Sequence, residues 1–214
     1  MSMKSPIPGL RFQWNKVFVN EAQRRHRVFS NLVPKLQSRK GLLYLKVQEY
    51  IDLIEELEAQ VARTQEEAEF VPSVSDYMPE ITHTVETEPV IVAGVEIEQI
   101  RSIDIRVADY SLFGTPPVVD RAVDVSKRLI ELEARLKQDR TNMAILEEEF
   151  EEVSRQLAVF EDKFVPWLEA AIRKVKQWLS DTEALAAGIA GKVKKRHQVA
   201  AAEADAAAQA TGVE

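Results

Sequence analysis

Apolar residues recur at helical spacing over most of the first third of the chain. Between about residues 10 and 69 they follow one another every three or four positions, the period of one face of an α-helix. The members of this stripe are Leu10, Trp14, Val17, Val28, Leu32, Leu36, Leu43, Tyr50, Ile54, Leu57 and Val61. Pro34 interrupts the stripe, and its missing N–H and bulky ring predict a kink there rather than an end. We therefore expect one long N-terminal helix.

A second, longer stripe occupies the last part of the chain. From Val125 the apolar positions advance mainly by steps of four and three, and Asp139 interrupts them. They are Leu129, Leu132, Leu136, Met143, Leu146, Phe150, Val153, Leu157, Phe160 and Phe164. A heptad pattern over roughly 40 residues predicts a coiled coil. Beyond Phe164, extra steps of four raise the repeat, so the left-handed supercoil should be lost near Pro166.

The segment between the stripes, residues 70–117, has a different character. Helix-breaking prolines are frequent and β-branched residues dominate. We predict two strands, Val90–Val92 and Val95–Val107, with a turn or bulge at Ala93-Gly94 between them. Residues 111–117 read SLFGTPP and predict a loop. The segment is therefore expected to be a small β-hairpin insert.

Burying the two stripes against each other is the simplest fold for these segments. The predicted fold class is mainly α, a long antiparallel two-helix coiled coil with a small β-hairpin insert between the helices. The expected domains are a first helix over 10–69, the insert over 70–117, a second helix over 118–197 and an alanine-rich tail over 198–214, frayed or disordered. The second helix would be roughly 120 Å long, so we expect a rod whose residues after about Val175 project as a single helix.

Charge favours the antiparallel pairing. If the bend lies between Glu69 and Val118, the numbers of facing residues add up to about 187. This register places Lys35, Arg39 and Lys40 opposite the glutamates of residues 147–152, and Arg24 and Arg25 opposite Glu161 and Asp162. Exposed ion pairs stabilise by only about 0–1 kcal/mol each. We therefore expect charge to select the register and apolar burial to supply the stability.

Composition argues against several classes of function. The 214 residues include no cysteine, which removes disulfides, thiolate nucleophiles and cysteine metal ligands. The net charge of −7 argues against general nucleic-acid binding. No apolar run approaches the roughly 18 residues of a membrane span, and the first residues lack the apolar core of a signal peptide. A soluble protein is expected.

Patterns that could carry chemistry each have a plainer explanation. The glutamates of residues 147–152 fit a solvated or ion-paired helix face. The three histidines, at positions 26, 83 and 197, share no local metal-ligand spacing. Gly188–Lys192 is too short for a phosphate-binding loop and lacks its hydroxyl residue. We predict no catalytic residue, no cofactor and no metal site, hence no enzyme.

Several segments resemble one known family. Ile91–Ile97 resembles its strand-and-glycine segment, and Asp109–Pro116 its aromatic-glycine loop before the second helix. Residues 146–165 (LEEEFEEVSRQLAVFEDKFV), followed by Pro166 and AAIRKVKQWL, are similar to its C-terminal helix. Together with the order of long helix, β insert and longer helix, they resemble the D subunit of V/A-type rotary ATPases, in its divergent bacterial branch. The resemblance covers roughly residues 10–197.

This resemblance implies a non-catalytic rotor component of the central stalk. Its helices would form an axle inserted, termini first, into the ring of A and B subunits. The F subunit would bind the exposed shaft, and the small-d subunit, also called C, would seat the lower end on the membrane rotor ring. Torque would couple ATP synthesis or hydrolysis to H⁺ or Na⁺ transport. The protein would be cytoplasmic and peripheral to the membrane through the complex, with no nucleic acid bound and no direct membrane insertion.

We expect the contact with the A/B ring at the axle tip, formed by residues 10–27 and 167–197. The candidate contact residues are Trp14, Arg24, Arg25, Trp167, Arg173, Lys174, Lys176, Trp178, Lys192, Lys194 and Lys195. The two C-terminal tryptophans lie beside the apolar stripe, so packing explains them equally well. A stand-alone coiled-coil scaffold or adaptor is the alternative function, and a basic-tipped nucleic-acid tether is a third. Generic coiled coils seldom carry a β insert between unequal helices, which favours the rotor function.

Overall fold

The computed structural model describes residues 4–110, 114 and 116–210, with side chains through residue 200. Its elements are α1 (Lys16–Glu67), a 3₁₀ helix η1 (Val71–Tyr77), β1 (Ile81–Val92), β2 (Val95–Val107), α2 (Val118–Val159), a π-helical turn η2 (Phe160–Phe164) and α3 (Val165–Ala210). The chain divides into two compact units. The terminal unit is Met1–Pro34 with Ala158–Glu214, and the middle unit is Lys35–Leu157.

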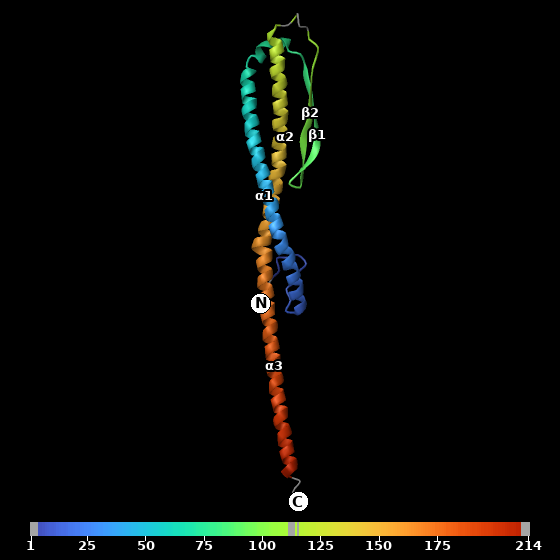
Figure 1. Ribbon diagram of the computed structural model, residues 1–214, viewed down its shortest axis with the longest axis vertical. Coiled ribbons are helices and arrows are strands. Elements are labelled where there is room, and N and C mark those ends of the chain that lie inside the picture. The colour runs from blue at the N-terminus through green and yellow to red at the C-terminus, as the bar shows by residue number, and fades with distance from the viewer. Residues whose placement is uncertain (1–3, 111–113, 115, 211–214) are drawn as a thin grey trace. The chain divides into compact units, whose positions relative to one another are not determined.

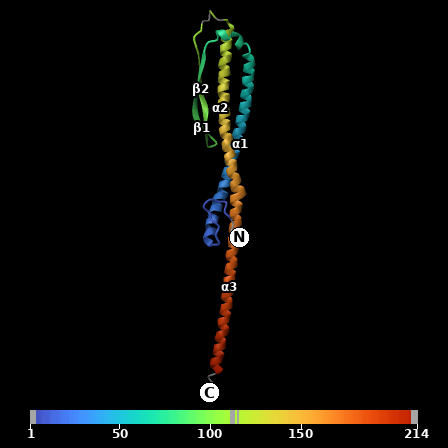
Figure 2. The same cartoon turned by 180° about the vertical axis from the view of Figure 1, so that it is seen from behind.

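In the middle unit, the second part of α1 runs antiparallel to α2, with the β-hairpin beside α2 (Figure 1 and Figure 2). The apolar stripes meet as predicted. Ile54, Leu57 and Val61 of α1 pack with Leu136 of α2, and Leu129, Leu132 and Met143 cover this cluster. The fold is therefore mainly α, a helical hairpin with a two-stranded antiparallel sheet inserted between the helices.

Ion pairs across the middle unit test the predicted register. Arg39 Nη2 lies 2.7 Å from Glu149 Oε1, and Lys40 Nζ lies 5.6 Å from the centroid of the Phe150 ring. Both contacts fall where the register placed the glutamates of residues 147–152. Closer to the insert, Arg140 pairs with Glu58 at 2.6 Å. The residue numbers of this second pair add up to more than the predicted 187. The predicted register is therefore correct near Arg39 and shifts toward the bend.

The β-hairpin turns at Ala93-Gly94, as predicted, but β1 is longer than expected. It begins at Ile81 and includes Pro89, which lies opposite Glu98, whereas the prediction started the strand at Val90. Residue pairs alternate between hydrogen-bonded and non-bonded along an antiparallel ladder. Counting from the closing pair Val92–Val95, residue 89 belongs to a pair without inter-strand hydrogen bonds. Pro89, which has no N–H, therefore removes no hydrogen bond from the ladder.

Both turn residues have positive φ, 52° at Ala93 and 78° at Gly94, as a type I′ hairpin turn requires. Gly94→Ala is expected to destabilise the protein by about 1–2 kcal/mol because an L side chain disfavours this conformation. A Cβ at position 94 would approach Arg39 Nη2 only to 4.0 Å, so the cost is conformational, not steric. Urea unfolding measures it. Ala93→Asn, which suits positive φ better, should instead leave stability unchanged or raise it; equal losses in both variants would contradict this explanation.

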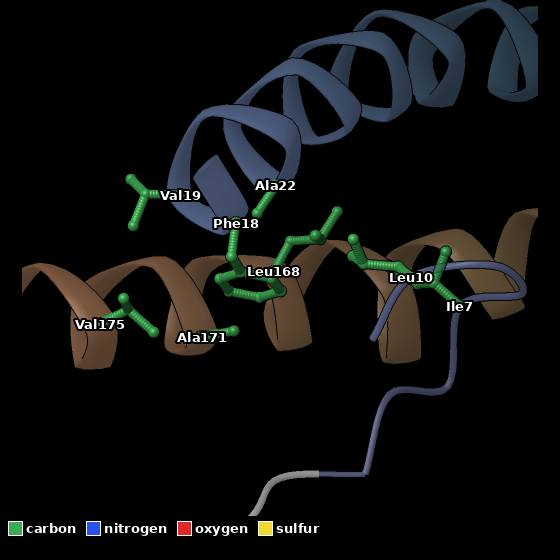
Figure 3. Close-up of a cluster of buried hydrophobic side chains, with 8 residues drawn as sticks. All are labelled: Ile7, Leu10, Phe18, Val19, Ala22, Leu168, Ala171 and Val175. Carbon is green, nitrogen blue, oxygen red and sulfur yellow. The ribbon is translucent and has the colours of Figure 1, made fainter. Parts of the chain in front are cut away.

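In the terminal unit, the start of α1 packs against α3 (Figure 3). Phe18, Val19 and Ala22 of α1 meet Leu168, Ala171 and Val175 of α3, and Ile7 and Leu10 of the preceding segment complete the buried cluster. Asn15 begins the helix by accepting a hydrogen bond from the Phe18 N–H at 2.7 Å, a side-chain N-cap. Ile7 and Leu10 therefore pack the N-terminal segment against both helices.

A π-helical turn precedes Pro166, where the sequence predicted the supercoil to change. The Val165 N–H bonds to the Phe160 carbonyl, five residues back. Such a turn accommodates an extra residue, and Phe29 packs its ring at 5.1 Å from Phe160 and 5.7 Å from Phe164. After Pro166, α3 continues to Ala210, into the alanine-rich tail. Its residues 181–200 are exposed, which matches the single helix expected after about Val175.

Candidate partner-binding surface

Three of the predicted contact residues form an aromatic and cationic cluster in the terminal unit. Trp14 lies with its ring centroid 5.5 Å from that of Trp178, and Lys174 Nζ is 5.8 Å from the Trp14 centroid. Phe12 supports Trp14 edge-on at 5.2 Å. Trp14 is 38% exposed and Trp178 40% exposed. Their rings therefore pack on each other and still present an amphipathic surface to a partner.

Trp167 and Arg25 make contacts inside the unit. The Trp167 ring is half-buried and stands edge-on to Phe18 at 6.5 Å, which fits the packing explanation of this residue. Arg25 pairs with Glu21 Oε1 at 2.8 Å and donates to the Pro8 carbonyl at 3.1 Å, so it holds the N-terminal segment against α1. Arg24, beside it, is exposed.

Arg173 and Lys176 lie on a groove between α1 and α3. Residues that sequence reasoning did not select share its lining, among them His26, Arg27 and Glu169. His26 Nε2 lies 3.1 Å from Glu169 Oε1. These two residues stand 143 positions apart, so no local spacing could reveal the pair. Only a residue-accurate register of α1 on α3 would have placed them together.

The remaining candidates, Lys192, Lys194 and Lys195, lie on the exposed part of α3. Leu185, Ile189 and Val193 stand four positions apart on the same stretch and are 69%, 63% and 47% exposed. Side chains four apart share one helix face. This stretch is thus amphipathic, with an apolar row that the described residues of the chain leave uncovered.

A buried polar cluster attaches the β-hairpin to α2 in the middle unit. Asn142 is 1% exposed, and its Nδ2 donates to the Glu98 carbonyl at 2.7 Å. Gln138 Nε2 donates to the same oxygen at 3.1 Å. Glu98 belongs to a non-bonded pair of the ladder, so its carbonyl points out of the ribbon and is available to the two amides. We call these three groups the amide clamp.

Two titratable side chains adjoin the amide clamp. Burial raises the pKa of the Asp139 carboxyl, and Arg135 partly opposes that rise. Burial also raises the pKa of the Tyr50 hydroxyl, and the nearby Asp139 adds to the effect. The sequence showed Asp139 as a break in the apolar stripe. It gave no sign of the clamp, because the acceptor is a backbone carbonyl of a strand.

The described residues contain no group of three or more histidine, cysteine or acidic side chains placed to hold a metal ion. Among the same residues, no helix combines the length and apolar character that crossing a bilayer demands.

The paired helices and the inserted β-hairpin place the chain in the class of intramolecular antiparallel coiled-coil proteins. Within that class, the chain belongs to the D-subunit family of ATP synthases, which it matches over residues 19–195. By family it is one component of a multi-subunit ATPase. The segment Asp109–Pro116, compared above with the family's loop, lies partly outside the described residues.

Curated relatives are named as the D subunit of a V-type ATP synthase. The protein from Chlamydia pneumoniae is 27% identical over 181 residues, which cover 81% of this chain and 87% of the relative. That from Chlamydia caviae is 29% identical over 174 residues, with 78% and 84% covered. That from Borreliella burgdorferi is 27% identical over 175 residues, with 79% and 86% covered. The bacterial resemblance seen in the sequence is confirmed.

Proposed function

We propose that this chain is the central-stalk rotor of a V-type ATPase, passing torque between the nucleotide-binding A/B ring and the membrane rotor. It would thereby couple ATP synthesis or hydrolysis to H⁺ or Na⁺ transport without catalysing a reaction itself. The observation that carries the proposal is the end of α3. Residues 181–200 are exposed, helical and amphipathic, and family membership supplies a complex in which such a helix finds a partner.

The packing of each unit suits a part that must resist twist. In the middle unit, interlocked apolar side chains and the Arg39–Glu149 pair fix the register of α1 on α2. In the terminal unit, the cluster around Leu168 does the same for α1 and α3. An asymmetric rotor stabilises different conformations of otherwise equivalent ring sites as it turns.

The proposed partners are the A and B subunits at the terminal unit, the F subunit on the shaft, and the small-d subunit, also called C, toward the membrane rotor ring. The protein would be cytoplasmic and held at the membrane through this complex. Co-purification of the full chain with an A/B hexamer tests the proposal. A stable complex supports it, whereas an isolated homodimer that ignores the hexamer favours a scaffold or adaptor.

Reversing the charges of Lys192, Lys194 and Lys195 to glutamate is expected to weaken binding to the A/B ring by at least roughly tenfold, since charge complementarity controls partner selection. These side chains are exposed, so thermal unfolding of the free chain should change little. Surface plasmon resonance against the purified hexamer measures the affinity. The matched control replaces the same lysines with arginine and should bind like wild type. If the glutamate and arginine variants bound the hexamer equally well, these lysines would not contribute to the contact with the A/B ring.

A further inference from the structure

The groove between α1 and α3 in the terminal unit has a cationic lining. Its volume is about 660 Å³, and the polar residues that line it include His26 and Arg27 from α1 with Glu169, Arg173 and Lys176 from α3. Ile172 gives it an apolar, partly buried wall. The chain as a whole is acidic, with a net charge of −7. The groove therefore has the opposite sign to the molecule that carries it.

Glu169 has the single carboxylate among the described lining residues of the groove. It contacts His26 of α1 and not a cation of its own helix, α3. Glu169 and Arg173 stand four positions apart, the spacing and order that best favour a pair along a helix. Glu169 instead lies 3.1 Å from His26 across the two helices. Arg173 forms no ion pair with a described side chain, and the same holds for Arg27 and Lys176. By contacting Glu169, His26 leaves Arg27, Arg173 and Lys176 available to a binding partner.

We propose that this groove binds an acidic segment of a partner protein that surrounds the chain, with Arg27, Arg173 and Lys176 as the binding residues and His26 as a positioning residue. The inference rests on the proposed function and deepens it by naming the chemistry of one contact. Guanidinium groups bind carboxylates through two parallel hydrogen bonds, and two of the three cations are arginines from different helices. In a peptide with aspartate or glutamate beside apolar residues, the carboxylates would pair with the two guanidinium groups. The apolar residues would cover Ile172.

A protein segment fits the groove better than a small free anion. The three cations are exposed on two helices, so water competes for each of them, and a small anion held by them would leave the Ile172 wall uncovered. A peptide excludes that water along the length of the groove. Charges desolvated by a partner interact more strongly than charges left at an open surface.

Carbodiimide cross-linking of the chain in complex with the A/B ring tests the contact directly, because it joins a lysine amine to a carboxylate in contact with it. Peptide mapping is expected to find Lys176 joined to an aspartate or glutamate of the ring. Lys176→Arg removes the amine, so it should abolish this product and thereby assign the cross-link to Lys176. A complex in which Lys176 is joined to no ring carboxylate would overturn the proposal.

Affinity measurements separate this proposal from the proposed function. The triple variant Arg27→Gln, Arg173→Gln and Lys176→Gln should bind the ring about tenfold or more weakly, with a flatter dependence on salt. His26→Leu should lose part of that affinity, because Glu169 can then pair with Arg173. Adding Glu169→Gln to His26→Leu should restore it, a rescue that a merely structural role for His26 would not give. Circular dichroism checks that each variant folds.

If wild-type chain fails to bind the ring, the proposed function is wrong. If wild type binds and the triple variant binds equally well at every salt concentration, the rotor function stands and the groove proposal is wrong.

Discussion

Leu168→Ala is expected to lower the free energy of unfolding by about 2–5 kcal/mol. Leu168 is fully buried in the cluster that joins α1, α3 and the N-terminal segment. Truncating it removes apolar contacts and leaves a cavity that Phe18, Ala171 and the other neighbours can fill only in part. Urea unfolding followed by circular dichroism gives the value.

Leu185→Ala is the matched control for Leu168→Ala. It makes the same substitution on the same helix, but Leu185 is 69% exposed. Its effect on the unfolding of the free chain should stay within about 0.5 kcal/mol. If the two variants lost the same stability, the buried cluster would not be what holds the terminal unit together.

Asn142→Asp is expected to destabilise the chain by about 3 kcal/mol or more, because it places a carboxylate in a buried position facing the Glu98 carbonyl. The new side chain keeps the shape of asparagine but loses the N–H that donates to this oxygen at 2.7 Å. Asp139, three residues earlier, already has a pKa raised by burial. Hydrogen exchange of β2 amides should rise, since the hairpin then loses one of the two amide donors to the Glu98 carbonyl.

The loss in Asn142→Asp should shrink as pH falls. Burial raises the pKa of the introduced carboxyl above its unfolded value, so the folded state takes up a proton first and regains an O–H donor. Unfolding at several pH values measures this. Thr141→Asp, one residue away and exposed, should show neither the large loss nor the recovery at low pH. A similar loss in both variants would mean that helix propensity, not the clamp, is responsible.

The sequence predicted the parts of the fold that depend on repeated patterns. Two stripes of apolar residues indicated the helical hairpin because each stripe has to be buried against something. Ala93-Gly94 located the turn because it lies between two runs of β-branched residues. Arg39 with Glu149 confirmed the register where the charges are dense. Each of these signals repeats along the chain or resides in a short local motif.

The features that escaped prediction depend on single contacts. The first strand was predicted to begin at Val90, but it continues through Pro89, whose nitrogen faces the open edge of the two-stranded ribbon. The π-helical turn before Pro166 adds one residue to a turn, which no period analysis resolves. His26 meets Glu169 only because α1 and α3 lie side by side in one particular register.

Among the candidate contact residues, the sequence chose by residue type, and the structure separates them by environment. Trp14, Lys174 and Trp178 come together at the surface, whereas Arg25 holds the Pro8 carbonyl. Residue type alone could not distinguish these arginines and tryptophans. The distinction comes from the neighbours of each side chain, such as the Pro8 carbonyl beside Arg25 and Phe18 beside Trp167.

The amide clamp recognises a main-chain oxygen, and this has an evolutionary consequence. Any amino acid at position 98 offers the same carbonyl, so homologues are free to vary that strand residue while the ribbon stays attached. The helix side is more restricted, because the side chain at the buried position 142 must supply a hydrogen-bond donor that reaches this oxygen. Sequence drift across the family should therefore be wide on the strand and narrow on the helix.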